Sequence, residues 1–281
     1  MQELVKTYPR KVSMFCKLFG YTKQAYYKQC SNFKDASGNE KQALAAVVQL
    51  RRQLPRLGTR KMHFLLKEEF SCKQLKIGRD KLFRLLRREG LLISKRKKYT
   101  VTTFSKHWMH KYPNKIKDIH LNRPEQLWVA DITYLATREG NAYLHLITDA
   151  YSKQVMGYEL CADLEAASSL KALTMALKNR QYPHQQLIHH SDRGLQYCSK
   201  LYVNELKRNG IQISMTENGD PYENAIAERM NGILKDEFGL GEELEDHQQA
   251  AKLTHQGVNY YNSLRPHLSC DKPTKKPQAF L

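Results

Sequence analysis

The sequence has no cysteine pair spaced Cys-x-x-Cys and no run of about 18 apolar residues long enough to cross a membrane. Its six cysteines are scattered over 281 residues, which argues against a disulfide framework and indicates reduced intracellular thiols. The N-terminal stretch MQELVKTYPRKV lacks the apolar core of a signal peptide. These absences favour a soluble, cytoplasmic protein that does not act at a membrane.

Acidic residues are scarce in the first part of the chain. Lys and Arg outnumber Asp and Glu by 46 to 28 overall. Residues 1–123 carry 30 basic and 8 acidic side chains, whereas residues 124–281 carry 16 and 20. A strongly basic module joined to a mildly acidic one predicts a nucleic-acid-binding region attached to a domain with another task. A solvated basic face would explain a single basic run, but it fits an excess of this extent poorly.

Residues 39–93 have the helical periodicity of a helix-turn-helix-like DNA-binding domain. Three helices are expected, over ALAAVVQLRRQL, GTRKMHFLLKEEF and GRDKLFRLLRREGLL. The buried side of the third helix is predicted to hold Leu82, Phe83, Leu85 and Leu86. Its other face carries five basic residues expected to contact DNA, namely Arg79, Lys81, Arg84, Arg87 and Arg88. An exposed surface helix without a ligand is the alternative.

The segments on either side of this domain are less regular. Residues 1–38 predict two short helices around Gly20, which form either a second helix-turn-helix or a plain helical hairpin. Residues 94–123 are rich in Lys and Arg and have no clean period, which predicts a basic linker able to follow a DNA backbone. It begins with four candidate phosphate contacts, Lys95, Arg96, Lys97 and Lys98.

Residues 124–281 change character and predict an α/β domain. LWVADITYLAT, NAYLHLITDAY and KQVMGYELCA are three strand-like runs with the spacing of hairpins. A helix near 164–179, the strand LIHHSD, a helix near 199–209 and the strand IQISM follow, and two helices near 221–238 and 244–262 come last. Three antiparallel strands followed by alternating helices and strands is the order of a ribonuclease H-like fold, with five strands and helices on both faces.

Three acids stand out in this domain. Asp131 lies inside an apolar strand, where a lone carboxylate costs several kcal/mol unless it is paired, hydrogen-bonded or bound to metal. Asp192 ends the strand LIHHSD, at the edge where open α/β sheets bind ligands. Glu228 lies in a helix for which Asp220 is a suitable N-cap. Taken singly, the three acids could be a buried polar anchor, a turn residue and a surface acid, but together they predict a catalytic set.

The helix that carries Glu228 also predicts a polar stripe. Asn224, Glu228, Asn231 and Lys235 follow an i, i+4, i+7, i+11 series, so they share one side of the helix. Lys235 is placed to contact DNA phosphate, and the two asparagines are candidate DNA contacts. Carboxylate oxygens suit hard cations, and three carboxylates can hold the two Mg²⁺ or Mn²⁺ ions that in-line displacement at a phosphodiester requires.

The blocks WVADITYL, HSDRGLQY and NAIAERMNGILKDE resemble the three catalytic blocks of the IS-three family of insertion-sequence transposases, the OrfB product. Thirty-five residues separate Asp192 from Glu228, a spacing typical of those enzymes and of retroviral integrases, and Lys235 matches a basic position of the pattern. Glu223 stands where the family often has Asp, without loss of a proposed ligand. Asp149 matches a further acidic position and is interpreted as a turn or supporting residue.

The resemblance implies a DDE transposase that binds the terminal repeats of an insertion sequence. Metal-activated water would nick the DNA to free a 3′-hydroxyl, which would then join to DNA by transesterification at the same site. It further implies a bacterial protein, nucleoid-associated when bound to DNA, that is a homo-oligomer on DNA and is fused to or assisted by an upstream OrfA product. Two alternatives remain: a ribonuclease H-like nuclease without strand transfer, and an inactive DNA-binding regulator.

Overall fold

The computed structural model describes residues 5, 7–20, 22–94, 108–117, 119–217 and 224–267. The chain divides into two compact units, one of Met1–Arg52 and Gly58–Ile93 and the other of Gln53–Leu57 and Ser94–Leu281. Among the described residues, no helix is both long and apolar enough to cross a membrane.

The second unit is built on a five-stranded mixed sheet with the strand order β3-β2-β1-β4-β5. Strands β1, β2 and β3 are antiparallel neighbours, whereas β4 lies parallel to β1 and β5 lies parallel to β4. The strand bounds are Leu127–Thr137, Gly140–Asp149, Val155–Cys161, Ile188–Ser191 and Gln212–Met215. This topology confirms the predicted ribonuclease H-like sheet.

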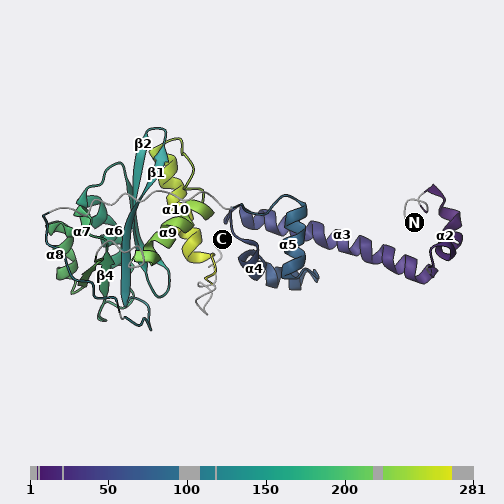
Figure 1. Cartoon of the computed structure of the whole chain (residues 1–281), viewed down its shortest axis with the longest axis horizontal. Coiled ribbons are helices and arrows are strands. Elements are labelled where there is room, and N and C mark those ends of the chain that lie inside the picture. Colours follow the sequence, from purple (N-terminus) through teal and green to yellow (C-terminus); the bar gives the residue numbers. More distant parts are fainter. Residues whose placement is uncertain are drawn as a thin grey trace. The chain divides into compact units, whose positions relative to one another are not determined.

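Helices cover both faces of the sheet (Figure 1). On one face α6 packs on β2 and β3, and α8 packs on α6 and β5; on the other, α9 packs on β1 and β2, and α10 on β1 and β3. These four helices span Ala166–Lys178, Lys200–Arg208, Ala225–Glu237 and His247–Ser263. A short helix that the sequence did not predict, α7, spans Leu195–Cys198 directly after the turn that follows β4.

The side chains of β1 point alternately to the two faces of the sheet, and both faces of this strand are buried. Trp128 and Ala130 pack in the core cluster that includes α6 and α8 residues, whereas Leu127 and Val129 pack in the cluster that includes Ala227 of α9. Since successive strand residues point to opposite faces, Asp131 falls on the side of α9. The apolar run around this acid therefore reflects a central strand.

Part of the predicted linker packs on the five-stranded sheet. Ile116, Ile119 and Leu121 pack against the cluster on the α9 side of β1. The backbone N–H of Lys115 donates to Ser214 Oγ at 2.9 Å, which holds the segment along β5. The described residues from 108 to 123 thus differ from a free linker, and Lys95, Arg96, Lys97 and Lys98 lie outside the described residues.

The first unit contains α2 (Val12–Leu18), α3 (Lys23–Arg51), α4 (Thr59–Cys72) and α5 (Arg79–Arg88). Helix α3 is one helix of 29 residues, so the prediction of a short helix after Gly20 and a separate one at 43–54 is wrong. Helices α3, α4 and α5 contact one another through buried side chains. The predicted burial is confirmed for Leu82, Leu85 and Leu86 but wrong for Phe83, which is 40% exposed.

Candidate active site

The register between β1 and β4 places Asp131 and Asp192 beside each other. Val129 pairs with His190 in the parallel ladder, and each aspartate lies two residues further along its strand direction. Both side chains line one cavity of about 520 Å³, whose wall also includes Tyr134 and Gln196. The two aspartates that the sequence singled out are thus brought together at the end of β4.

Hydrogen bonds fix the two carboxylates. Oδ1 of Asp131 accepts from the backbone N–H of Ile132 at 2.9 Å, and its Oδ2 accepts from the side-chain amide of Asn231 at 2.7 Å. Oδ1 of Asp192 accepts from the backbone N–H of Gly194 at 3.0 Å. Each carboxylate therefore keeps a defined orientation toward the cavity.

The negative charges of the site act on one another. The pKa of Asp131 is raised to about 7, chiefly by burial and also by the carboxylates of Asp192 and Glu228, against the opposing hydrogen bonds from Ile132 and Asn231. A carboxylate with a pKa this high lies in a position where its charge is poorly compensated. A bound divalent cation would supply the missing positive charge.

Glu228 is set apart from the two aspartates. It is exposed on α9 and lines a different hollow, together with Arg229 and Asp236. Within the described part of the chain, no group of three or more His, Cys, Asp or Glu side chains lies close enough to hold a metal ion. The structure brings together two of the three predicted acids, and Glu228 reaches them through its electrostatic effect on Asp131.

The other members of the predicted polar stripe on α9 are buried against β1. The amide of Asn224 donates to the carbonyl oxygen of Ala130 at 3.3 Å, and Asn231 contacts Asp131. Nζ of Lys235 lies 4.5 Å from the ring centroid of Tyr134. Burial lowers the pKa of Lys235, an effect that the Asp131 carboxylate opposes. DNA contact by these residues stays a prediction, since the structure directs their side chains toward the sheet.

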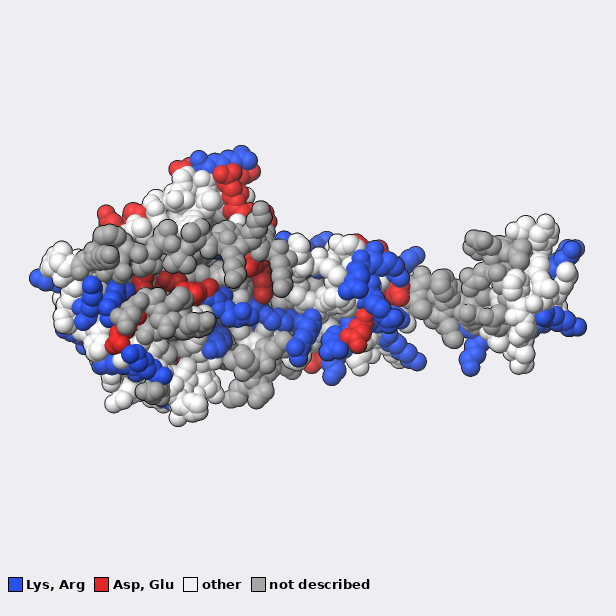
Figure 2. All heavy atoms as spheres, in the orientation of Figure 1, with Lys and Arg blue, Asp and Glu red and all other residues white. Residues whose placement is uncertain are grey.

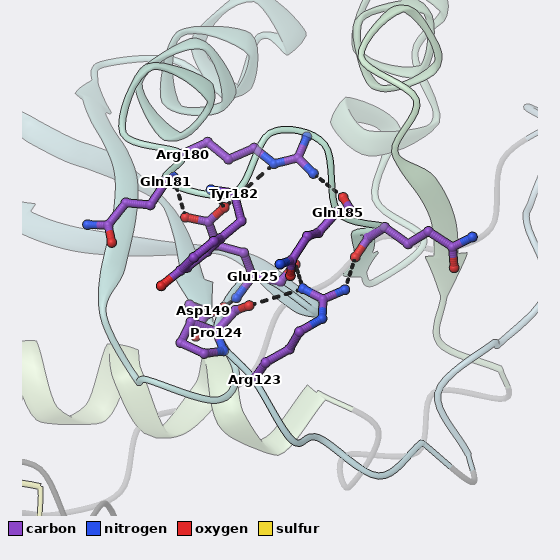
Figure 3. Close-up of polar contacts among 9 residues, drawn as sticks. Arg123, Pro124, Glu125, Asp149, Arg180, Gln181, Tyr182 and Gln185 are labelled. Carbon is purple, nitrogen blue, oxygen red and sulfur yellow. Dashed lines mark hydrogen bonds and ion pairs between the residues drawn. The ribbon is translucent and has the colours of Figure 1, made fainter.

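A polar network that the sequence did not signal holds β1 in place (Figure 3). Glu125, buried and with a φ of 56°, accepts from the backbone N–H groups of Gln181 at 2.6 Å and Tyr182 at 3.0 Å. Its own N–H donates to Asp149 Oδ2 at 2.7 Å, and Arg180 Nε lies 3.6 Å from its Oε2 (Figure 3). The network joins the start of β1 to the loop before β4, so it supports both strands that carry the aspartates.

Asp149 is a turn residue, as predicted. Its Oδ1 accepts from the backbone N–H of Ser152 at 2.6 Å and from the Ser152 hydroxyl at 2.7 Å. The carboxylate is fully buried at the turn that joins β2 to β3. It therefore supports the fold around β1 and lies outside the cavity that the two aspartates line.

The basic residues predicted on α5 differ in their surroundings. Arg79 Nε lies 2.9 Å from Asp80, and Arg88 lies 2.8 Å from Glu40. Arg84 and Arg87 are exposed, and the structure gives neither an ion pair with a described acid; Lys81 is half-buried. Lys and Arg side chains gather over α5 on the face that Figure 2 shows.

Comparison with known proteins gives consistent matches. Two family models described as integrase core domain match residues 122–221 and 209–274. A 31 kDa protein of insertion element IS600 from Shigella sonnei is 33% identical over 90% of this chain and 92% of its own length. The transposase for insertion sequence element IS629 from the same species is 32% identical over 68% of this chain, and transposase InsF of IS3A from Escherichia coli K12 is 37% identical over 56%. The matches span 64% and 54% of those two transposases.

Solved structures are also similar to parts of the chain. The HTLV-2 integrase catalytic core domain in complex with magnesium covers 52% of this chain and 90% of its own at 18% identity, with a TM-score of 0.42. A chain from the structure of a simian T-cell lymphotropic virus intasome in complex with PP2A regulatory subunit B56 gamma covers 83% of this chain and 76% of its own at 16% identity, with a TM-score of 0.45.

Proposed function

Because this chain belongs to the IS3 family of DDE transposases, we propose that it nicks DNA at the terminal repeats of an insertion sequence and joins the freed 3′-hydroxyls to DNA. The observation that carries the proposal is the β1–β4 register, which sets Asp131 beside Asp192 at one cavity. A phosphodiester entering this cavity would meet both carboxylates at once. DNA is therefore the proposed substrate in both steps.

Asp131, Asp192 and Glu228 are the proposed ligands of two divalent cations, Mg²⁺ or Mn²⁺. The chemistry of the donors fits such ions, because all three offer hard oxygen atoms, and burial together with the charges of Asp192 and Glu228 raises the pKa of Asp131. The buried Oδ1 of Asn231, beside Asp131, also has no hydrogen-bond partner among the described residues. With the cations bound, the site gains activation of the attacking oxygen and stabilisation of the leaving oxygen.

The protein's own side chains would hold the site in order. The Asn231 amide orients the Asp131 carboxylate, and the Gly194 N–H orients that of Asp192. Lys235, buried beside Tyr134, contributes positive charge on the same side of β1, where negative charge on a reacting phosphate would be stabilised. These residues position groups, and none is assigned a proton transfer.

Selection of the DNA is assigned to the basic first part of the chain. The exposed arginines of α5, and Lys95, Arg96, Lys97 and Lys98 beyond it, are proposed to neutralise phosphates. We further propose that the protein acts as a homo-oligomer on DNA and is fused to or assisted by an upstream OrfA product. Footprinting of the terminal repeat with the purified chain, alone and with that product, tests whether this chain binds the repeat by itself or needs the OrfA product.

The decisive experiment is metal-dependent cleavage and joining of terminal-repeat oligonucleotides. We expect wild type to cleave and join with Mg²⁺ or Mn²⁺, and Asp192→Asn and Glu228→Gln each to lose both steps by at least about 100-fold. Glu243→Gln, at an exposed acid after α9, is the matched control and should behave as wild type. Equal activity of Glu228→Gln and wild type would refute the assignment of that ligand.

Two rival functions give different outcomes in the same experiment. A ribonuclease H-like nuclease would cleave in a metal-dependent manner, yet its 3′-hydroxyl products would never join to target DNA. An inactive DNA-binding regulator would bind the repeat without any cleavage, and Asp192→Asn would leave that binding unchanged. The presence of Asp131, Asp192 and Glu228 together favours an active enzyme.

A further inference from the structure

Phe83 lies in the middle of the exposed basic face of α5. Its ring is 40% exposed, while its neighbours Leu82, Leu85 and Leu86 are buried at 3% exposure or less. Arg79, Phe83 and Arg87 follow an i, i+4, i+8 series, so one turn of helix separates the ring from an arginine on each side. An apolar ring thus interrupts a row of positive charge.

The ring and its neighbour are held together. Cζ of Arg87 lies 5.0 Å from the centroid of Phe83, within the range of a cation–π contact. Such a contact orients the guanidinium over the ring and covers one ring face. The arrangement presents a flat apolar surface and a cation at the same place on α5.

Helix α5 is firmly supported behind this face. Leu82, Leu85 and Leu86 bury its inner side, where it packs against α3 and α4. The carbonyl oxygen of Ile77, just before α5, lies 3.3 Å from Nε2 of His63 on α4. The exposed face therefore belongs to a helix that is packed on its inner side, which suits direct contact with the edges of base pairs.

The charge around α5 indicates which kind of partner binds its exposed face, the one that carries Arg79, Phe83 and Arg87. Residues 39–93 carry 14 basic and 5 acidic side chains, and basic side chains gather over α5 (Figure 2). The complement is polyanionic, and a helix of this size fits the major groove of a DNA duplex. Contact with phosphates alone gives the Phe83 ring no role, because phosphates offer it no apolar surface. In the major groove, the C5-methyl group of thymine is the apolar group that an aromatic side chain contacts.

We propose that Phe83 reads a thymine in the terminal repeat by contact of its ring with the C5-methyl group, while Arg79 and Arg87 bind DNA on either side. The proposal rests on terminal-repeat binding within the proposed function and adds a specificity-determining residue to it. It predicts that α5 enters the major groove and that Phe83 contributes sequence preference, whereas Arg84 contributes sequence-independent affinity.

The test removes a single methyl group. The wild-type chain is used to select a duplex from a randomised 20-bp library, and each thymine of the selected duplex is then replaced by deoxyuridine, one at a time. We expect one replacement to weaken wild-type binding about fourfold, the effect of about 0.8 kcal/mol for one buried methyl-sized group. Phe83→Ala should bind the thymine duplex about fourfold more weakly and lose all sensitivity to that replacement.

Matched variants control the interpretation. Phe64→Ala removes another exposed phenylalanine ring, on α4, and should keep the full deoxyuridine effect. Arg84→Ala should weaken binding to both duplexes equally and reduce the salt dependence. Circular dichroism shows whether Phe83→Ala keeps its helices.

Three outcomes would overturn the proposal: no enriched sequence in the library, no thymine position sensitive to deoxyuridine, or an unchanged deoxyuridine effect in Phe83→Ala. The cleavage and joining assay is independent of these binding measurements. If the wild-type protein does not join DNA but its binding depends on the thymine methyl group through Phe83, only the enzymatic proposal is refuted. If it joins DNA but its binding shows no such dependence, only the Phe83 proposal is refuted.

Discussion

The side-chain amide nitrogen of Asn231 lies 2.7 Å from Oδ2 of Asp131, although the two residues are 100 positions apart in the chain. The contact joins α9 to the centre of β1. A supporting residue that hydrogen-bonds a metal-ligating carboxylate fixes the direction of its free lone pairs. Asn231 is thus the residue through which the helix that carries Glu228 controls the geometry of Asp131.

Asn231→Ala is expected to lower cleavage and joining about 10–100-fold, because the Asp131 carboxylate loses the bond that orients it. The Mg²⁺ concentration for half-maximal activity should rise as well, which a general loss of stability would not cause. The measurement is a Mg²⁺ titration of oligonucleotide cleavage. Asn259→Ala, which removes an exposed amide on α10, is the control and should titrate as wild type.

Several elements of the fold followed from sequence pattern because each has a local cause. The long apolar run around Asp131 indicated a central strand, and Asp192 followed a short strand directly, so the sheet edge could be predicted. The burial of Glu125 could not, because its partners are backbone N–H groups of a loop more than 50 residues away. Contacts between residues so far apart in the chain leave no signal in the local sequence pattern.

Two predictions made from the sequence are wrong, each for a different physical reason. The sequence predicts separate helices before and after residue 38, yet α3 runs through this stretch, because helix formation is cooperative. Phe83 was assigned to the buried side although, at about 100° per residue, it lies outside the arc that Leu82, Leu85 and Leu86 define. The helical geometry alone would have placed the Phe83 ring at the exposed edge.

Acid should destabilise the catalytic unit through two buried histidines. Burial lowers the pKa of His189 to about 3 and that of His145 to about 4, so both are neutral in the folded protein. In the unfolded chain they titrate near 6.5, and their contribution to stability is therefore full above that pH and is lost as pH falls toward 4. These two histidines alone would lower the free energy of unfolding by up to about 3 kcal/mol per pH unit in this window, and proton uptake by Asp131, whose pKa is raised to about 7, should offset about half of that fall.

Denaturant unfolding at pH 7, 6 and 5 measures this effect. His189→Gln should reduce the fall by up to about 1.4 kcal/mol per pH unit, because one of the two titrating histidines is gone. His120→Gln changes an exposed histidine and should retain the full slope. An unfolding free energy that stays constant from pH 7 to pH 5 would contradict the prediction.

Glu125→Ala should reduce the free energy of unfolding by about 3–5 kcal/mol, the cost of leaving a buried charge and its donors without a partner. The N–H groups of Gln181 and Tyr182 would lose their acceptor, and the Arg180 guanidinium would lose its ion pair. Fluorescence of Trp128, fully buried in the sheet, reports the transition during guanidinium denaturation.

The control for Glu125→Ala is an exposed ion pair in the same unit. Glu159→Ala removes a pair with Lys171 at 3.3 Å, and solvent screening should hold its effect below about 1 kcal/mol. Similar losses for Glu125→Ala and Glu159→Ala would show that the buried network contributes no more to stability than a surface pair.

At Gly157, β3 and α6 approach each other closely. A Cβ atom there would lie 2.1 Å from the carbonyl oxygen of Ala172 and 2.7 Å from the backbone nitrogen of Ala176. Because both atoms belong to the α6 backbone, rotation of a side chain cannot relieve the clash. Gly157→Ala should therefore shift α6 and destabilise the catalytic unit by about 3 kcal/mol.

Gly232 in α9 offers the opposite case, since a Cβ atom there meets nothing within 4 Å. Gly232→Ala should stabilise the unit by about 0.5–1 kcal/mol, because alanine loses less backbone freedom than glycine in a helix. Thermal unfolding of the two variants, followed by Trp128 fluorescence, should give melting temperatures on opposite sides of wild type. If Gly157→Ala melted at or above wild type, α6 and β3 would have room to separate, and the tight packing behind the Asp131 strand would not be required for stability.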